Sequence, residues 1–259
     1  NRDVFFIQTR RAKGDVMVYR NEDTGTEKRI IKSIQGKVLT LDRPLKIEHY
    51  GTGEFRSEVA NLSRNVIIES ADPDGVRGHT MYHRNSKGGI SYARFAHLGK
   101  EGLLGRYAIH FHLVGTTMRG SAVLGASIVD SHNRWVTVHG TQYLIVRDCV
   151  GYQSVGHGYF MEDGTEVFNL MDRNLGVQAF HGKQLPDQAL PFDPNDGAAF
   201  WWANGRNTLT RNVAVENARY GFRYDSQKRS NFDSNLNILM PDGTRKTVDI
   251  RTLAITRFE

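Results

Sequence analysis

Short apolar stretches alternate with polar and small residues along the chain, and ionisable side chains recur at the ends of several of them. Three such blocks are GRYAIHFH (105–112), VTVHG (136–140) and GHGYFMEDG (156–164). Repeats of about 20 to 30 residues are typical of solenoids, in which each repeat forms one coil. Because the blocks alternate with the period of two expected of strands, we predict an all-β fold, a right-handed single-stranded parallel β-helix.

The two ends of the chain depart from this repeat. Residues 1–60 contain alternating stretches at 15–19, 29–34 and 37–41, which predict a short N-terminal β segment, either a cap or the end of a β domain. We expect residues 61–259 to form the β-helix, with one or two further coils after residue 225. Three prolines within nine residues predict an inserted loop at 181–197.

The repeat interval predicts which side chains share a column. It is 27 residues from His112 to His139 (139−112) and 24 from His139 to Asp163 (163−139). Stacked coils lie about 4.8 Å apart, so His112, His139, Asp163 and then Asn204 are expected to line up on one outer face. His110 lies two positions before His112, so its side chain points to the same face.

Three imidazoles on neighbouring strands, next to a carboxylate, are a typical metal-binding set. We predict His110, His112, His139 and Asp163 as ligands, with Glu162 as the alternative oxygen donor and an open position for water. The donor types favour zinc, copper, nickel or iron over calcium. The alternative is a structural ladder of histidines that bond one another and water.

Acid–base chemistry is the second candidate activity of this face. We predict Glu162 or Asp163, working with His157 or His139, as the groups that transfer protons in acid–base catalysis. Adjacent residues on a strand point in opposite directions, so both carboxylates serve only if the turn at Gly164 rotates them. The alternative is that Asp163 is a turn residue.

Four further side chains are candidates for binding a ligand. Arg106 and Arg134 precede the two histidine strands and are suited to bidentate contact with a carboxylate of the ligand. Trp201 and Trp202 occupy successive strand positions, so one is expected to face outward as a stacking platform. The alternatives are corner salt bridges for the arginines and core packing for the tryptophans.

Composition narrows the class of partner. The net charge is +6 and the pI is about 9.4, which favours an anionic partner, that is, nucleic acid, acidic polysaccharide or anionic lipid. The alternative is an ordinary solvated basic surface. No nucleic-acid-binding motif is present, and no apolar run reaches the 18 residues that suggest a membrane span. Cys149 is the single cysteine, which excludes an internal disulfide.

The blocks GRYAIHFHLVG, VTVHG, VGYQSVGHGYFMEDGTE and FWWANGRNTL resemble the parallel β-helix region shared by the cell-migration-inducing hyaluronan-binding protein, the cell-surface hyaluronidase and fibrocystin-like proteins. EVANLSRNVIIES resembles the junction at which the G8 domain of this family leads into the β-helix. The shorter chain with one cysteine suggests a short bacterial-type relative.

The resemblance implies an extracellular or secreted, hyaluronidase-like enzyme that degrades hyaluronan or a similar uronate-containing glycan in a groove on the side of the β-helix. It also implies calcium, where the residues themselves favour a zinc-like metal. A polysaccharide lyase that acts by β-elimination, and a non-catalytic glycan-binding or adhesion module, remain as alternatives.

Overall fold

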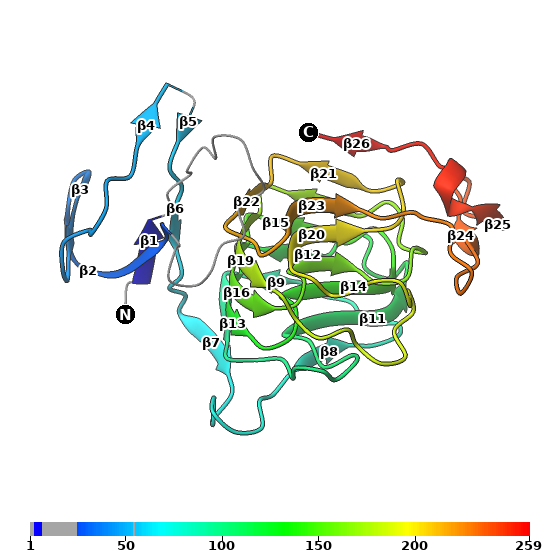
Figure 1. Cartoon of the computed structure of the whole chain (residues 1–259), viewed down its shortest axis with the longest axis horizontal. Helices are drawn as coiled ribbons and strands as arrows, with labels where there is room; N and C mark the ends of the chain where they lie inside the picture. The colour runs from blue at the N-terminus through cyan, green and yellow to red at the C-terminus, as the bar shows by residue number, and fades with distance from the viewer. Residues whose placement is uncertain (1–2, 7–24, 54) are drawn as a thin grey trace.

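The computed structural model describes residues 3–6, 25–53 and 55–259, which form an all-β parallel β-helix (Figure 1). The described residues contain one 3-10 helix, η2 (Ile250–Thr252), and no α-helix. Among them, no helix is long and apolar enough to span a membrane. The prediction of a parallel β-helix is therefore confirmed. The stretch at 15–19 lies outside the described residues.

Each coil contributes one strand to each of three six-stranded parallel sheets, here called sheets I, II and III. Sheet I consists of β7 (Val66–Glu69), β10 (Ala93–Ala96), β13 (Ser127–Ser131), β16 (Val150–Val155), β19 (Leu175–Phe180) and β22 (Val213–Val215). Sheet II consists of β8 (Thr80–Tyr82), β11 (Ile109–Gly115), β14 (Val136–Thr141), β17 (Tyr159–Met161), β20 (Ala198–Trp202) and β23 (Tyr220–Tyr224). Sheet III consists of β9 (Ile90–Ser91), β12 (Ala122–Leu124), β15 (Ile145–Arg147), β18 (Leu170–Asp172), β21 (Thr208–Thr210) and β26 (Arg257–Phe258).

The corner between sheets III and I is built by a stack of asparagines. Asn174 accepts a hydrogen bond from the Cys149 amide at 3.1 Å and donates to the side chain of Asn212 on the next coil at 3.0 Å. The residue before each of these corners, such as Asp148 or Arg173, has a left-handed backbone conformation. Side chains that bond backbone groups stabilise such turns, so the corner recurs in successive coils.

The interior of the β-helix is filled by columns of inward-facing side chains. Tyr159, Phe200 and Phe222 stack on successive coils of sheet II, with ring centroids 4.8 and 4.9 Å apart. Trp135 is fully buried beside this column, and its indole nitrogen donates to the carbonyl of Gln153 at 3.1 Å. Close packing of this kind leaves little room for added atoms.

Replacement of Gly158 by alanine is expected to destabilise the fold. A methyl group there would lie 2.2 Å from the ring of Trp135 and 2.6 Å from the carbonyl oxygen of Ala199, and neither neighbour is free to move. Overpacking of this kind costs about 1–3 kcal/mol or more in free energy of unfolding, measurable by urea denaturation. Gly78→Ala is the control, because Gly78 has no left-handed backbone and the nearest atom to an added methyl group there lies at the ordinary contact distance of 3.5 Å. Equal stability of Gly158→Ala and wild type would contradict the tight packing around Trp135.

The N-terminal strands form an antiparallel sheet of order β3-β2-β1-β6, with β1 (Asp3–Phe6), β2 (Glu27–Gln35), β3 (Val38–Leu41) and β6 (Val59–Asn61); β4 (Gly51–Thr52) and β5 (Phe55–Arg56) pair separately. Ala60 and Leu62 pack on Val129 and Tyr152 of sheet I. The hydroxyl of Thr26 donates to Glu216 at 2.6 Å, which links this segment to the coil of β22.

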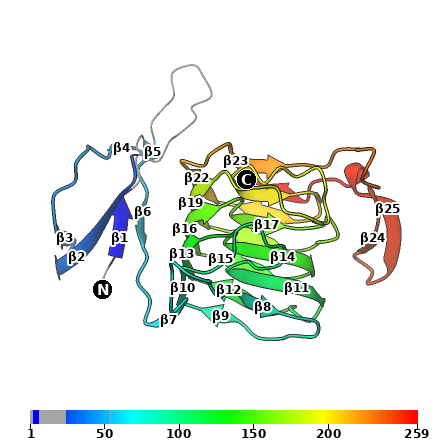
Figure 2. The same ribbon diagram turned by 60° about the horizontal axis from the view of Figure 1, so that its bottom comes forward.

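The C-terminal part does not form the further coils that the sequence predicted. Instead β24 (Asn235–Leu239) and β25 (Arg245–Asp249) form an antiparallel hairpin, and after η2 the chain returns to add β26 to sheet III. The turn at 240–244 closes on itself through the Met240 amide and the Thr244 carbonyl, so the two strands pair locally. The hairpin lies on the opposite side of the β-helix from the N-terminal sheet (Figures 1 and 2).

Candidate functional site

The register of sheet II corrects the predicted column. His112 pairs with His139, as predicted, but Val138 pairs with Met161, so Glu162 and not Asp163 follows His139. The step between these two coils is 23 residues (161−138). The sequence predicted 24, the interval between His139-Gly140 and Asp163-Gly164. Because Phe111 pairs with Tyr82, His83 continues the column on the other side of His112. The ring centroids of these two histidines lie 5.2 Å apart.

Four side chains, on β11, on β14 and directly after β17, converge on the outer face of sheet II: His110, His112, His139 and Glu162, here called the histidine cluster. Nδ1 of His139 lies 3.2 Å from Nδ1 of His112 and 3.4 Å from Oε2 of Glu162. The same carboxylate oxygen lies 3.5 Å from Nε2 of His110. One ligand atom from each histidine falls within 4.8 Å of the others. The predicted grouping of the three histidines is thus present in the structure.

Outer hydrogen bonds set the orientation of two of these imidazoles. His110 Nδ1 lies 3.1 Å from the carbonyl oxygen of Gly105, which only accepts, so Nδ1 carries the proton. His139 Nε2 lies 3.1 Å from Oδ2 of Asp163 and donates in the same way. In the neutral form of each ring, the unprotonated nitrogen therefore faces the interior of the histidine cluster. Metal-binding histidines are typically oriented by such carbonyl and carboxylate acceptors.

Two buried atoms of the histidine cluster lack a hydrogen-bond partner within the described chain. They are Nε2 of His110 and Oε2 of Glu162, which face each other at 3.5 Å without a hydrogen bond, on side chains that are 1% and 4% exposed. A buried polar atom without a partner costs about 1–3 kcal/mol, so such pairs indicate a missing ligand, water or ion. Ligands about 2.0–2.1 Å from a tetrahedral metal lie about 3.3–3.4 Å from one another, close to the separations between neighbouring atoms given above. The residues therefore fit a transition metal ion.

Charges around the histidine cluster favour a cation. Burial opposes ionisation of Glu162, but its interactions with His110, Arg134 and His139 prevail and lower its pKa to about 2. Burial and the neighbouring imidazoles lower the pKa of His112 to about 4. Burial also acts to lower the pKa of His139, but the bond to Asp163 and the charge of Glu162 outweigh it and leave the pKa raised. The site thus presents an ionised carboxylate and a neutral imidazole near neutral pH.

Arg134 does not occupy the position predicted for a substrate-binding residue. It is completely buried, with its guanidinium 3.5 Å from the ring centre of Phe160. It lies 3.8 Å from Oε1 of Glu162 and 3.7 Å from Oδ2 of Asp193. Its role is therefore to balance two buried carboxylates, and contact with a substrate is excluded by burial. Arg106 is exposed and remains a predicted contact.

His157 and the two tryptophans are also buried, contrary to their predicted roles. Both ring nitrogens of His157 are used, by Asp193 at 2.7 Å and by the Ala198 amide at 2.9 Å, so no nitrogen is left for proton transfer to a substrate. Trp202 faces the interior. Trp201 faces outward, but Leu190 of the loop and residues of the β24–β25 hairpin cover it. Neither tryptophan is an exposed stacking platform.

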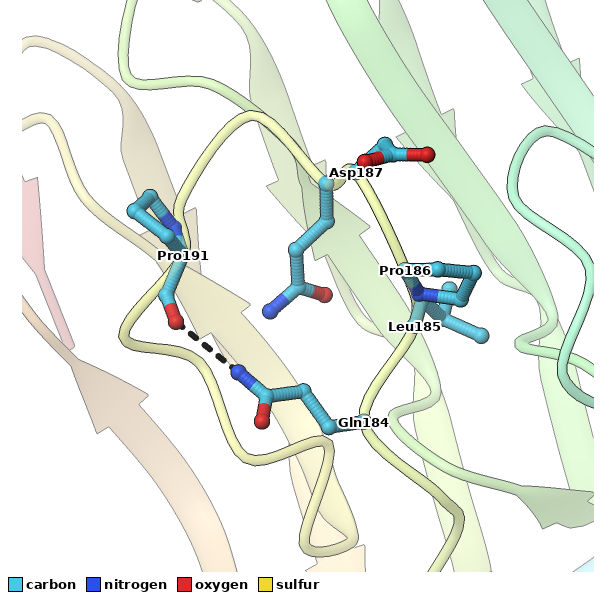
Figure 3. Close-up of a pocket in the computed structure, with 6 residues that line it drawn as sticks. Gln184, Leu185, Pro186, Asp187 and Pro191 are labelled. Carbon is cyan, nitrogen blue, oxygen red and sulfur yellow. Dashed lines mark hydrogen bonds between the residues drawn. The ribbon is translucent and has the colours of Figure 1, made fainter.

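The inserted loop has an internal structure of its own. Leu185 and Leu190 are buried, and Gln184 donates to the carbonyl oxygen of Pro191 at 2.8 Å. The loop surrounds a hollow of about 450 Å³, lined by residues 184–188 and Pro191 (Figure 3). None of these residues belongs to the histidine cluster.

Asp163 lies at the edge of the histidine cluster, where it combines the predicted turn role with the contact to His139. Its Oδ1 accepts from the Thr165 amide at 2.7 Å. Glu166, which the sequence did not single out, is fully buried and accepts from the amides of Gly140 and Gly164 at 2.8 and 2.9 Å. Burial and the charge of Asp163 raise the pKa of Glu166 well above its usual range. Asp163 is therefore the ionised member of this pair.

Other contributors to the site gave only weak signals in the sequence. Tyr107 donates to Oε1 of Glu162 at 2.8 Å, and Asp193 comes from the inserted loop. His83 could have been found from the interval of 29 residues to His112 (112−83), close to that between His112 and His139. Asp193 lies in the stretch that breaks the repeat, so periodicity says nothing about its position.

Comparison with known proteins identifies the family of the β-helix. Residues 75–258 match the family model described as CEMIP beta-helix, and residues 1–27 match a family of unknown function, DUF1523. Fibrocystin-L of Mus musculus is 31% identical over 274 residues, covering 84% of this chain and 6% of the relative. Communication mutant protein F of Dictyostelium discoideum is 36% identical over 213 residues, covering 76% of this chain and 19% of the relative. The chain thus spans less than a fifth of the length of either relative.

Proposed function

This chain belongs to the CEMIP β-helix family, and from that premise we propose that it is an extracellular, metal-assisted enzyme that cleaves an anionic, uronate-containing polysaccharide such as hyaluronan. The observation that carries the proposal is that four side chains converge at one place and that two of their buried atoms form no hydrogen bond within the described chain. The four residues are His110, His112, His139 and Glu162. The hyaluronan-binding and hyaluronidase relatives that the sequence resembles suggest the class of glycan.

The four side chains of the histidine cluster would hold the metal, and their nitrogen-rich donor set favours zinc or a similar ion over calcium. A metal held there would supply a Lewis acid and a bound water of lowered pKa. Glu162 is buried, so its role is to bind the ion and hold it against the histidines. Asp163 fixes the proton of His139 on Nε2 through the 3.1 Å contact and so leaves Nδ1 for the metal.

Proton transfer during glycosidic cleavage requires a group at the surface of the site. Asp163 and His139 are both 18% exposed, unlike the buried pair of Glu162 and His157. We therefore assign the candidate acid–base role to the ionised carboxylate of Asp163, as the base that accepts the proton of an attacking water, while the Nε2 proton of His139 stays on the ring that would hold the metal. Glu162 and His157 were predicted from sequence for the same role. Glu162 would instead bind the metal, and His157 pairs with the buried carboxylate of Asp193.

The decisive experiment combines elemental analysis of the purified chain with a measurement of hyaluronan length. Wild type is expected to contain close to one transition metal ion per chain and to shorten the polymer. The His112→Ala/His139→Ala double variant should lose both properties, because it removes two of four ligands. His181→Ala removes an exposed histidine outside the cluster and is the matched control.

The outcomes separate the alternatives. New ultraviolet absorbance from unsaturated uronate in the products would assign β-elimination, and shortening without it would assign hydrolysis. Metal-free wild type that binds hyaluronan but leaves its length unchanged would contradict the proposal and favour a non-catalytic glycan-binding module.

A further inference from the structure

A surface groove beside the histidine cluster provides a second binding feature. It has a volume of about 350 Å³, and its lining includes Arg84, Leu113, Gly140, Asp163, Asn237 and Arg245. The first four residues lie on or just after four successive strands of sheet II, and the last two lie on the hairpin strands β24 and β25. We propose that this groove binds an acidic polysaccharide and that Arg84 and Arg245 hold its carboxylates. The proposal rests on the proposed function and assigns its substrate-binding residues.

The length of the groove suits a polymer. Arg84 belongs to the first coil and Asp163 to the fourth, so their backbones are three coil spacings, or about 14 Å, apart. The hairpin stands beside these coils and supplies the second wall (Figure 2). An extended chain of sugars could therefore contact several coils at once.

The two arginines are available for an external anion. Both are exposed, and within the described part of the chain neither forms an ion pair; Arg245 only donates to the carbonyl of Asn237 at 3.3 Å. Other exposed arginines, such as Arg173 and Arg211, are paired with carboxylates of the protein. An unpaired guanidinium is well matched to a carboxylate, which it binds through two parallel hydrogen bonds.

The lining of the groove includes Gly140, which has no side chain, next to the apolar Leu113. Gly140 has a left-handed backbone with φ of +52°, and a methyl group there would lie 2.7 Å from Cδ2 of Leu113. The absence of a side chain leaves the half-buried Leu113 as a low apolar surface between the polar walls. An apolar floor with polar walls is a common arrangement in ligand sites and suits the face of a sugar ring.

Asp163 joins the groove to the histidine cluster. It lines the groove and its Oδ2 also contacts Nε2 of His139, so a polymer in the groove would pass directly beside the predicted metal ligands. This position distinguishes the groove from the hollow of the inserted loop in Figure 3, which shares no residue with the site. The groove therefore replaces Arg134 and the tryptophans as the predicted substrate contact.

The test measures the affinity of the full chain for hyaluronan oligosaccharides and for a neutral oligosaccharide of similar length. Arg84→Gln and Arg245→Gln are each expected to weaken hyaluronan binding about tenfold or more, since each removes a charge-assisted bidentate contact. Arg56→Gln is the matched control, because Arg56 is also exposed and bonds only a carbonyl of its own hairpin. Arg84→Lys should restore part of the affinity through charge alone.

Metal content measured on the same proteins separates this proposal from the proposed function. Affinity that falls in Arg84→Gln and Arg245→Gln but not in Arg56→Gln, with unchanged metal content, supports the groove. The same affinity in all these proteins, or equal binding of the neutral oligosaccharide, overturns the groove even if the wild type binds metal and shortens hyaluronan. Arginine-dependent binding by a chain that contains no metal supports the groove and overturns metal-assisted cleavage.

Discussion

Arg134→Met is expected to lower the free energy of unfolding by about 3–5 kcal/mol, the range typical when one partner of a buried ion pair is removed. Arg134 is the cation between Glu162 and Asp193, at 3.8 and 3.7 Å, and all three side chains are at most 4% exposed. Methionine preserves much of the packing on Phe160 but leaves two buried carboxylates without this cation. The remaining compensation comes from His157 for Asp193 and from the histidine cluster for Glu162.

Urea denaturation of wild type, Arg134→Met and Arg173→Met measures this effect. Arg173 forms a similar ion pair with Asp148 at 2.8 Å, but both side chains are at least one third exposed, so its loss should cost no more than about 1 kcal/mol. Arg134→Lys should be intermediate, because it retains charge without the planar fork. A loss of less than 1 kcal/mol in Arg134→Met would show that the two carboxylates do not depend on this guanidinium.

The fold could be predicted because apolar residues recur at equivalent positions in each coil. Val136 and Val138, or Tyr159 and Met161, alternate with outward residues and fill the same interior columns. Inward positions tolerate few polar residues, so the pattern survives in each coil. The C-terminal hairpin was missed because its strands alternate in the same way as those of a coil, and only the pairing partner differs.

The site could be predicted only in part. His110 and His112 share a face whatever the length of a coil, because alternation along a strand is local. The partner on the next coil depends on the number of residues at the corners, and one residue fewer replaces Asp163 by Glu162 in the column. Which outward residues are covered was not predictable either, since Trp201 and Arg134 are buried by segments that lie outside the repeat.

Replacement of Glu162 and of Asp163, one at a time, is the second change from which we expect a large effect. Glu162→Gln should weaken metal binding by at least about 100-fold, because it removes the one anionic ligand of the histidine cluster. Asp163→Asn should weaken it by about 10- to 100-fold, the range for a carboxylate that only orients a metal-binding histidine. Oε2 of Glu162 lies within 3.5 Å of the facing nitrogens of His110 and His139, whereas Oδ2 of Asp163 contacts the opposite nitrogen of His139.

Competition with a chelator of known affinity measures both constants on the folded proteins, and Asp148→Asn, at the partly exposed corner between sheets III and I, is the control. A larger loss in Asp163→Asn than in Glu162→Gln would reverse the assignment and restore Asp163 as the ligand predicted from sequence. The order of the two effects is informative because the carboxylates are adjacent in the chain yet contact opposite nitrogens of one imidazole. An oxygen donor on the Nδ1 side completes a set of four converging ligands, whereas one on the Nε2 side fixes only the tautomer.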